Sequence, residues 1–142
     1  MKKKTALRIK LLSIEGDGFH LMLKIKVNGK IAVMLIDTGA SKTVFDKNRI
    51  HNFVSETEFE KSKQLSTGLG TNTMESHLVI IKKIKLGDLL IENYKAVLLD
   101  LSHVNVAYQK IKLPPIDGVI GSDILLTYKG IIDYGKKQLI LK

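Results

Sequence analysis

The segment that most constrains the fold is an alternating strand pattern that ends in Asn28-Gly29. In residues 21–27, large apolar side chains occupy every second position, which is the period of a strand with one buried face. Asn28-Gly29 tolerates positive φ at both positions of a two-residue turn, so residues 31–36 should return as the partner strand. Because residues 31–36 are apolar throughout, we expect that strand to be buried on both faces.

The rest of the chain continues as short apolar strands between turn residues, which predicts a mainly β protein. Asp46 and Ser102 each precede a segment with helical potential and are expected to cap it. Further strands are predicted at 43–45, 84–91 (a hairpin turning at Gly87-Asp88), 96–99, 131–134 and 138–141, and helices at 46–54, 102–110 and 122–126. No repeat or linker interrupts this series, so residues 1–142 are predicted to form a single domain, with 1–18 as an N-terminal extension or first strand.

Composition excludes several classes of site. The 142 residues are 44% hydrophobic and 26% charged, as in a globular domain. There is no cysteine, which removes disulfides, thiolate zinc sites and cysteine nucleophiles. The four histidines show no metal-ligand spacing, so no metal is expected; they are His20, His51, His77 and His103. No apolar run reaches the roughly 18 residues of a membrane span or follows the first lysines as in a signal peptide, so we expect a cytoplasmic protein without a membrane partner.

The formal net charge of +9 raises the alternative of a nucleic-acid or anion-binding protein. The lysines are scattered along the chain, often beside apolar strand residues, and no series of aromatic residues offers a stacking platform. We therefore expect no nucleic-acid partner, and an anion-binding surface stays as a third functional hypothesis.

Asp37 stands at the end of an apolar strand, directly before Thr38 and Gly39. A carboxylate there is disfavoured by desolvation unless backbone N–H groups meet it, and a glycine lets the turn curl so that they can. Aspartate also opens many ordinary turns. Chemistry alone therefore supports a catalytic acid and a turn residue about equally.

The residues around Asp37 resemble a known active-site signature. Two apolar residues followed by Asp-Thr-Gly-Ala-Ser, at 35–41, are the signature of the retropepsin-like (retroviral-type) aspartic proteases. The sequence Gly-Val-Ile-Gly at 118–121 resembles that family's second signature, and a short helix follows it there as predicted here at 122–126. The resemblance covers roughly residue 19 to the C-terminus and is nearest to the single-domain cellular homologues of bacteria.

This resemblance implies a mainly β, closed retropepsin-like acid-protease barrel with short helices and one catalytic motif per chain. Asp37 would be the catalytic acid of an aspartic-type endopeptidase, a hydrolase that uses no cofactor. Two carboxylates sharing one proton are needed, so a second copy would supply its own Asp37 in a homodimer. By the same resemblance Thr38 would bond to the neighbouring chain, Gly39 would present its N–H to the carboxylate, and Ser41 would orient one carboxylate oxygen.

The family likeness also implies the substrate and the walls of its cleft. An extended polypeptide would bind as an added strand between a flap and the cleft floor. The flap hairpin is expected at the glycine-tipped segment, and Ala40 and Ile120 are expected on the apolar wall. The expected substrate-binding residues are Ala40, Gly68, Leu69, Gly70 and Ile120.

Three other aspartates have structural interpretations. Asp133 lacks a following Thr-Gly and is expected to be structural, Asp123 is expected at the start of a helix, and Asp117 is expected in a turn with at most a minor substrate role. Because a fold does not fix a function, a non-catalytic peptide-binding or dimerisation module with the same fold is the main alternative.

Overall fold

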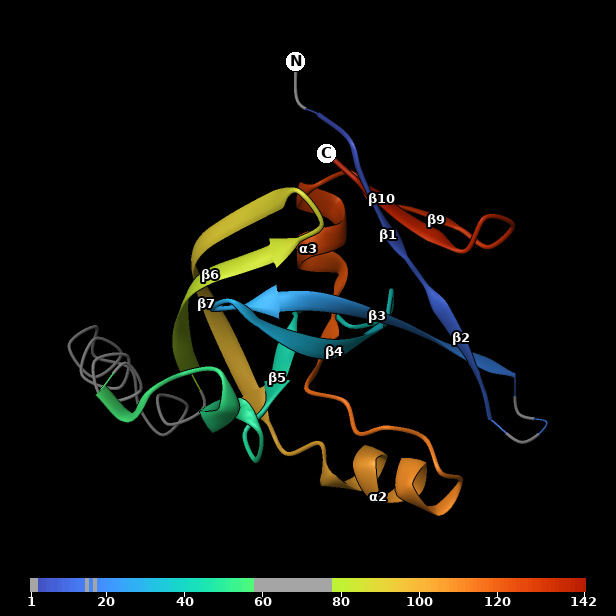
Figure 1. Cartoon of the computed structure of the whole chain (residues 1–142), viewed down its shortest axis with the longest axis horizontal. Helices are drawn as coiled ribbons and strands as arrows, with labels where there is room; N and C mark the ends of the chain where they lie inside the picture. The colour runs from blue at the N-terminus through green and yellow to red at the C-terminus, as the bar shows by residue number, and fades with distance from the viewer. Residues whose placement is uncertain (1–2, 15, 17, 58–77) are drawn as a thin grey trace.

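Six strands close into a barrel in the computed structural model (Figure 1), which describes residues 3–14, 16, 18–57 and 78–142. In order around the barrel they are β3 (Phe19–Val27), β4 (Lys30–Ile36), β8 (Gly118–Ile120), β5 (Val44–Asp46), β7 (Leu89–Leu99) and β6 (Leu78–Leu86). The ring closes where β6 pairs back onto β3 through Lys26 and Val27. The pairing closes the ring, and the predicted mainly β closed barrel is confirmed.

The predicted hairpin joins β3 to β4. Asn28 and Gly29 take φ values of 50° and 83°, as a two-residue turn between twisted strands requires. The expected burial of β4 on both faces is wrong at its start, since Ile31 is 63% exposed beside Lys26. Farther along, alternate β4 residues enter the barrel, while Val33 and Leu35 pack against a second cluster outside it.

A second, three-stranded sheet joins the two ends of the chain. β1 (Thr5–Arg8) pairs with β10 (Gln138–Leu141), which pairs with β9 (Ile131–Asp133). The next strand, β2 (Lys10–Ser13), is not part of this sheet and instead pairs with β3, extending the barrel sheet. Both termini therefore lie close together at one corner of the molecule (Figure 1).

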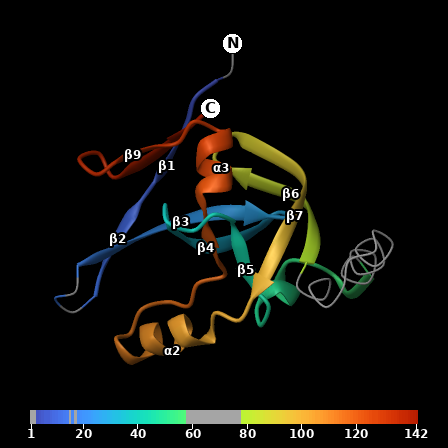
Figure 2. The same ribbon diagram turned by 180° about the vertical axis from the view of Figure 1, so that it is seen from behind.

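The apolar core has two parts that lie on opposite faces of β3 and β4. The larger fills the barrel, with Leu23, Met34 and Phe45 almost completely buried. The smaller lies outside the barrel wall and gathers Leu12, Met22, Leu101, Tyr108 and Ile116. Its cover is α2 (Ser102–Lys110), which lies at one end of the barrel in Figures 1 and 2.

The helix predicted at 46–54 is wrong, because only a 3₁₀ turn, η1 (Ile50–Asn52), forms there. Asp46 ends β5 and is 1% exposed. Its carboxylate accepts hydrogen bonds from the backbone N–H of Asn48 and Leu101 and from Asn105 Nδ2. A carboxylate buried this deeply needs such donors, so Asp46 joins β5 to α2 instead of starting a helix.

The other two predicted helices are confirmed as α2 and α3 (Ser122–Thr127). The expected cap of α2 is wrong in its detail, since Ser102 is the first helical residue and Asp100 Oδ1 accepts its N–H at 3.0 Å. Hydrogen bonds from Ser102, together with one from Asn48, lower the pKa of Asp100 to about 2. Neither helix, nor any other within the described ranges, is long and apolar enough to cross a membrane.

Candidate active site

Asp37 directly follows β4 and opens a tight turn toward β5. Its N–H donates to the Ile120 carbonyl at 2.9 Å, which continues the parallel pairing of β4 with β8, and its own carbonyl accepts the Ala40 N–H at 3.1 Å. Asp37, Thr38, Gly39 and Ser41 are exposed in the single chain. The carboxylate thus stands at the rim of the barrel on a rigid base.

One oxygen of the Asp37 carboxylate is held by the turn itself. The Gly39 N–H donates to Asp37 Oδ1 at 3.0 Å. A backbone donor held in the same turn fixes the orientation of the carboxylate. No hydrogen bond from the described residues reaches the second oxygen, Oδ2, which could face a water, a substrate or a second carboxyl group.

The segment 118–122 holds the Asp37 turn from behind. The Ala40 carbonyl accepts the Ser122 N–H at 2.7 Å, and Thr43 Oγ1 accepts the Gly121 N–H at 3.0 Å. A Cβ on Gly121 would lie 2.6 Å from Lys42 C, closer than real Cβ atoms come to backbone. The glycine of the second signature therefore has a physical role, because it allows the two segments to touch.

Asp123 fastens the same contact from the first turn of α3. Its Oδ1 accepts both the N–H and the hydroxyl of Thr43, at 2.9 and 2.8 Å, and its Oδ2 accepts the hydroxyl of Tyr94. The predicted helix-start position is correct, but the carboxylate bonds mainly to a loop 80 residues earlier in the chain. Asp123 therefore ties β5, β7 and α3 together behind the Asp37 turn.

These contacts shift two pKa values in opposite directions. Partial burial opposes ionisation of Asp123, yet hydrogen bonds from Tyr94, Thr43 and the backbone outweigh it and lower its pKa. Burial, and then the adjacent Asp123 carboxylate, raise the pKa of Tyr94. Tyr94 thus stays a neutral donor and Asp123 an ionised acceptor over the ordinary pH range.

Asp123 should contribute to the pH dependence of stability. Because its folded pKa lies below that of an unfolded aspartate (about 3.9), the stabilisation is present above that value and is lost as pH falls through the folded pKa. Asp123→Asn should lower the free energy of unfolding at pH 7 by about 1 kcal/mol, a modest value because the carboxylate is partly exposed. It should also lose less stability on acidification than the wild type, as urea unfolding between pH 7 and about pH 3 would measure.

The control for that measurement is Asp133→Asn, which makes the same chemical change at a half-buried acid in β9 whose carboxylate accepts the Lys136 N–H of its own turn. If Asp123→Asn lost as much unfolding free energy on acidification as the wild type, Asp123 would not be a source of the pH dependence of stability.

A pocket of about 620 Å³ opens beside Asp37. It is mostly apolar, with His20 as a polar side chain on one wall. Its lining residues are Phe19, His20, Leu21, Leu35, Ile36, Asp37, Thr38, Val104, Val119, Ile132 and Tyr134. His20 Nδ1 lies 2.5 Å from the hydroxyl of Tyr108, a buried residue of α2. The pocket has the size and apolar character of a ligand site.

The structure brings together only some of the residues expected in the site. Asp37 and Thr38 line the pocket, whereas Ala40 and Ser41 are outside its lining. Ile120, expected on the cleft wall, is fully buried in the barrel, and the adjacent Val119 lines the pocket instead. A three-residue strand such as β8 has too little alternation to tell which residue faces inward. The expected flap residues Gly68, Leu69 and Gly70 lie outside the described residues.

Several pocket residues were missed by sequence reasoning. Phe19 and His20 come from the start of β3, Val104 from α2, and Ile132 and Tyr134 from the region of β9. Nothing in their local pattern marks them. They meet only because distant segments cross at this rim of the barrel.

The remaining aspartates are structural. Asp117, expected in a turn, is 4% exposed, accepts the Val33 N–H at 2.8 Å and pairs with Arg49 Nε at 2.7 Å. Asp133 accepts the Lys136 N–H at 2.9 Å, which fits its expected structural role. Within the described ranges, no three His, Asp or Glu side chains gather as a metal site would require.

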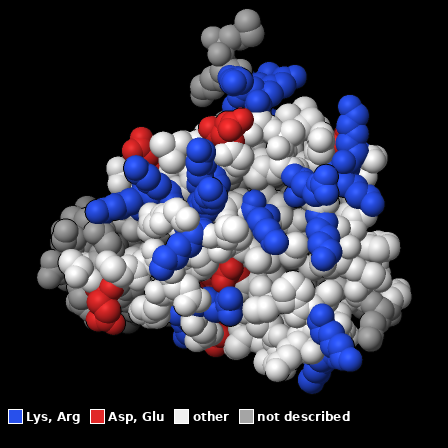
Figure 3. Space-filling view, viewed as in Figure 1, with Lys and Arg blue, Asp and Glu red and all other residues white. Residues whose placement is uncertain are grey.

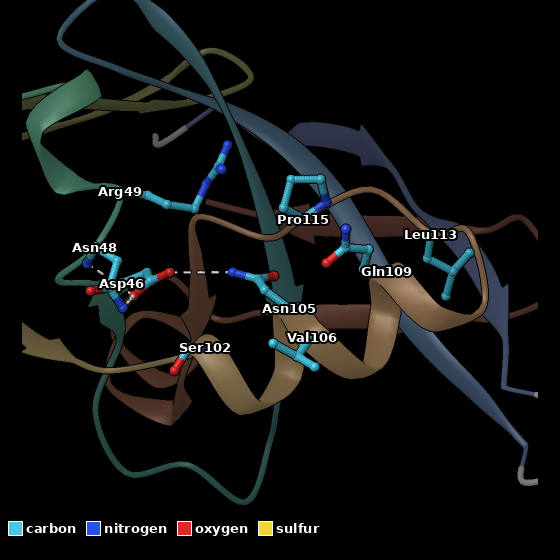
Figure 4. Close-up of a pocket in the computed structure, with 9 residues that line it drawn as sticks. All are labelled: Asp46, Asn48, Arg49, Ser102, Asn105, Val106, Gln109, Leu113 and Pro115. Atoms are coloured by element: carbon cyan, nitrogen blue, oxygen red, sulfur yellow. Dashed lines mark hydrogen bonds between the residues drawn. The ribbon is translucent and has the colours of Figure 1, made fainter.

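A second pocket, of about 530 Å³, lies between α2 and the β5–η1 connection. Figure 4 shows Asn48 and Asn105 directed at Asp46 from two sides. The amide of Asn105 also bonds both backbone groups of Ile116. These polar groups already have partners inside the fold, so this pocket is part of the packing of α2.

Comparison with known proteins agrees with this geometry. A sequence model of the family described as "Aspartyl protease" matches residues 23–124. A retropepsin-like aspartic protease from Rickettsia conorii is similar in structure, with a TM-score of 0.55 and 20% sequence identity over 99% of this chain and 94% of that chain. The retroviral protease-like domain of Ddi1 from Leishmania major is similar with a TM-score of 0.56 and 15% identity over 87% and 88% of the two chains. No curated protein matches the sequence.

Proposed function

The chain belongs to the retropepsin-like aspartyl protease family, and from that premise we propose that it is an aspartic endopeptidase active as a homodimer. The observation that carries the proposal is the Asp37 carboxylate itself. It is exposed at the rim of an apolar pocket, with one oxygen fixed by the Gly39 N–H and the other available. The substrate class that the family implies is a polypeptide.

The proposed chemistry needs two carboxyl groups and one water. The ionised carboxylate takes a proton from the water as its oxygen attacks the scissile carbonyl, while the protonated carboxyl donates to the developing oxyanion. The resulting tetrahedral species then breaks its C–N bond: the nitrogen receives the proton that the first carboxylate took from the water, and the hydroxyl formed from the oxyanion returns its proton to the second carboxylate. Two carboxyl groups a few ångströms apart share one proton, because both cannot be charged at that distance.

The second carboxyl group is proposed to be Asp37 of another copy, placed across a two-fold axis. Large apolar side chains are exposed around Asp37 and Thr38. Phe19 is 62% exposed, Tyr134 is 63% exposed and Leu126 is 82% exposed. Phe19 and Tyr134 line the pocket beside Asp37, and Leu126 lines a smaller one beside Thr38. Such a cluster is unfavourable in water and favours a contact with a second copy.

A subunit-mixing experiment tests the dimer and the shared site together. Adding an equal amount of Asp37→Asn chain to a fixed amount of wild type, under conditions where subunits exchange, should lower peptide hydrolysis to about one half, because mixed dimers hold one acid. The mass in solution, measured by light scattering, should be that of two chains, and a transition-state mimic of aspartic proteases should inhibit the wild type. A monomer with full activity in the mixture would refute the shared site.

The main alternative is a peptide-binding or dimerisation module without catalysis. Fold alone permits it, and the exposed setting of Asp37 in a single chain is compatible with it. The observation that distinguishes the two functions is whether two Asp37 carboxylates face each other across an open cleft, as the protease requires. A cytoplasmic location stays a prediction from the sequence.

A further inference from the structure

A gap in the wall of the barrel opens a pocket away from Asp37. On one side β3 pairs with β2 as far as Met22, and with β6 only from Lys26 onward. Residues 23–25 therefore have no strand neighbour on that side within the described structure. A pocket of about 440 Å³ lies there, between β1, β2, β3 and the β6–β7 turn at Gly87.

The rim of this pocket is cationic and its floor is apolar. Arg8, Lys10 and Lys24 line it and are exposed, while Leu7 and Met22 are 6% and 5% exposed. Among the described residues that line it, none is an aspartate or glutamate. None of the three cations forms an ion pair with another described residue.

Two further lysines extend the positive charge beyond the pocket. Lys26 and Lys85 face each other directly across the β3–β6 pair, and both are exposed. Like charges directly opposite in a sheet repel and are destabilising. Figure 3 shows Lys and Arg side chains spread over this face of the molecule, with few acidic ones between them. An anionic partner would relieve this repulsion.

The shape of the site favours a polypeptide over a nucleic acid. No aromatic side chain lines the pocket in the described part of the chain, so bases would find no stacking platform there. The buried Leu7 and Met22 suit the apolar parts of peptide side chains, and the unpaired stretch of β3 can accept an extended backbone. The same strand leads to the Asp37 pocket, since Leu21 lines that pocket and Lys24 lines this one, about 10 Å apart along β3.

We propose that the pocket formed by Arg8, Lys10 and Lys24 binds acidic segments of polypeptides and recruits substrates that carry them. The recruiting part rests on the proposed protease function, whereas the binding part does not. Carboxylates would meet the three cations at the rim, and neighbouring apolar side chains would reach the floor.

Binding is tested in the full-length chain carrying Asp37→Asn, so that no peptide is cleaved. The probe is a fluorescein-labelled poly-glutamate peptide, measured by fluorescence anisotropy. Changing Lys10 and Lys24 together to Glu should raise its Kd at least about tenfold. Raising the salt concentration from about 0.05 M to about 0.5 M should strongly weaken peptide binding to the chain that keeps Lys10 and Lys24. It should weaken binding to the chain with the Glu pair only slightly.

The matched control changes Lys95 and Lys110 to Glu. Both are exposed, on β7 and α2, and the pair alters net charge by the same amount. It should change the Kd by less than about twofold. An equal rise in Kd for both pairs of substitutions would overturn the proposal. It would show that binding depends on the net charge of the whole protein and not on this pocket. Tighter binding of a single-stranded oligonucleotide than of poly-glutamate, with the same dependence on Lys10 and Lys24, would overturn it in favour of nucleic acid.

Folding of the altered chain is checked by circular dichroism. If the Glu pair does not fold, Lys10→Gln with Lys24→Gln replaces it, and a Kd within about twofold of the unchanged surface would then overturn the proposal.

Recruitment is tested in the Asp37-containing enzyme with two peptides that share a cleavable sequence and differ in an acidic or a neutral tail. The Glu pair at Lys10 and Lys24 should raise KM for the acidic peptide alone and leave kcat unchanged. Equal KM changes for both peptides would overturn recruitment. Absence of any hydrolysis would instead refute the proposed function and leave the binding result standing.

Discussion

Replacing Asp37 with asparagine should reduce peptide hydrolysis at least about 10³-fold and leave the fold intact. Asparagine has nearly the same shape, and its carbonyl oxygen can still accept the Gly39 N–H that now reaches Oδ1 at 3.0 Å. It cannot take the proton of the attacking water at neutral pH. Turnover of a peptide library, read by mass spectrometry, measures the loss, and circular dichroism checks the fold.

Asp133→Asn is the matched control for this prediction. It makes the same chemical change at an acid outside the described lining of the Asp37 pocket, where the carboxylate accepts the Lys136 N–H of its own turn. Its hydrolysis rate should stay within about twofold of wild type. Equal turnover by wild type and Asp37→Asn would leave the peptide-binding module as the better function.

Replacing Gly121 with alanine should cost about 3 kcal/mol of unfolding free energy and also lower hydrolysis. The new Cβ would lie 2.6 Å from Lys42 C and 2.8 Å from the Ala40 carbonyl oxygen. Both are backbone atoms of the turn that carries Asp37, so relief requires moving that turn. Such movement would weaken the bonds from Gly121 N–H to Thr43 and from Ser122 N–H to Ala40.

Denaturant unfolding measures the first effect, and turnover at a temperature where the variant remains folded measures the second. Gly135→Ala is the control, because a Cβ there would meet only Asp133 Oδ1 at 3.4 Å, an ordinary contact. Its stability should change by no more than about 0.5 kcal/mol. If Gly121→Ala and Gly135→Ala had the same unfolding free energy, the close approach of Gly121 to the Lys42 and Ala40 backbone would not matter for stability.

Local sequence patterns predicted the features that depend on neighbouring residues. Asn28-Gly29 marks the hairpin because positive φ is a property of the dipeptide itself. The Asp37 turn is marked in the same way, since Gly39 stands two residues from the acid whose oxygen it meets. In both cases the interacting groups are only a few residues apart in the chain, so a local sequence pattern is enough to predict them.

The features that sequence reasoning missed depend on residues far apart in the chain. Asp117 looks like a turn residue before Gly118, yet its partner Arg49 lies 68 residues away. Asp46 looks like a helix cap, although its carboxylate is enclosed by Leu101 and Asn105. Burial of an acid by distant donors leaves no local pattern, which explains why these two carboxylates were misread.

The pairing of β4 with β8 also sets when the site can exist during synthesis. Asp37 donates its N–H to Ile120, and Thr43 bonds to Asp123, 80 residues later. A chain still on the ribosome has neither partner until this late stretch has emerged. The pairing of Thr5 with Leu141 can form only later still, because Leu141 emerges after these residues. The contacts that hold the Asp37 turn can therefore form only after residues 120–123 have emerged, well after Asp37 itself.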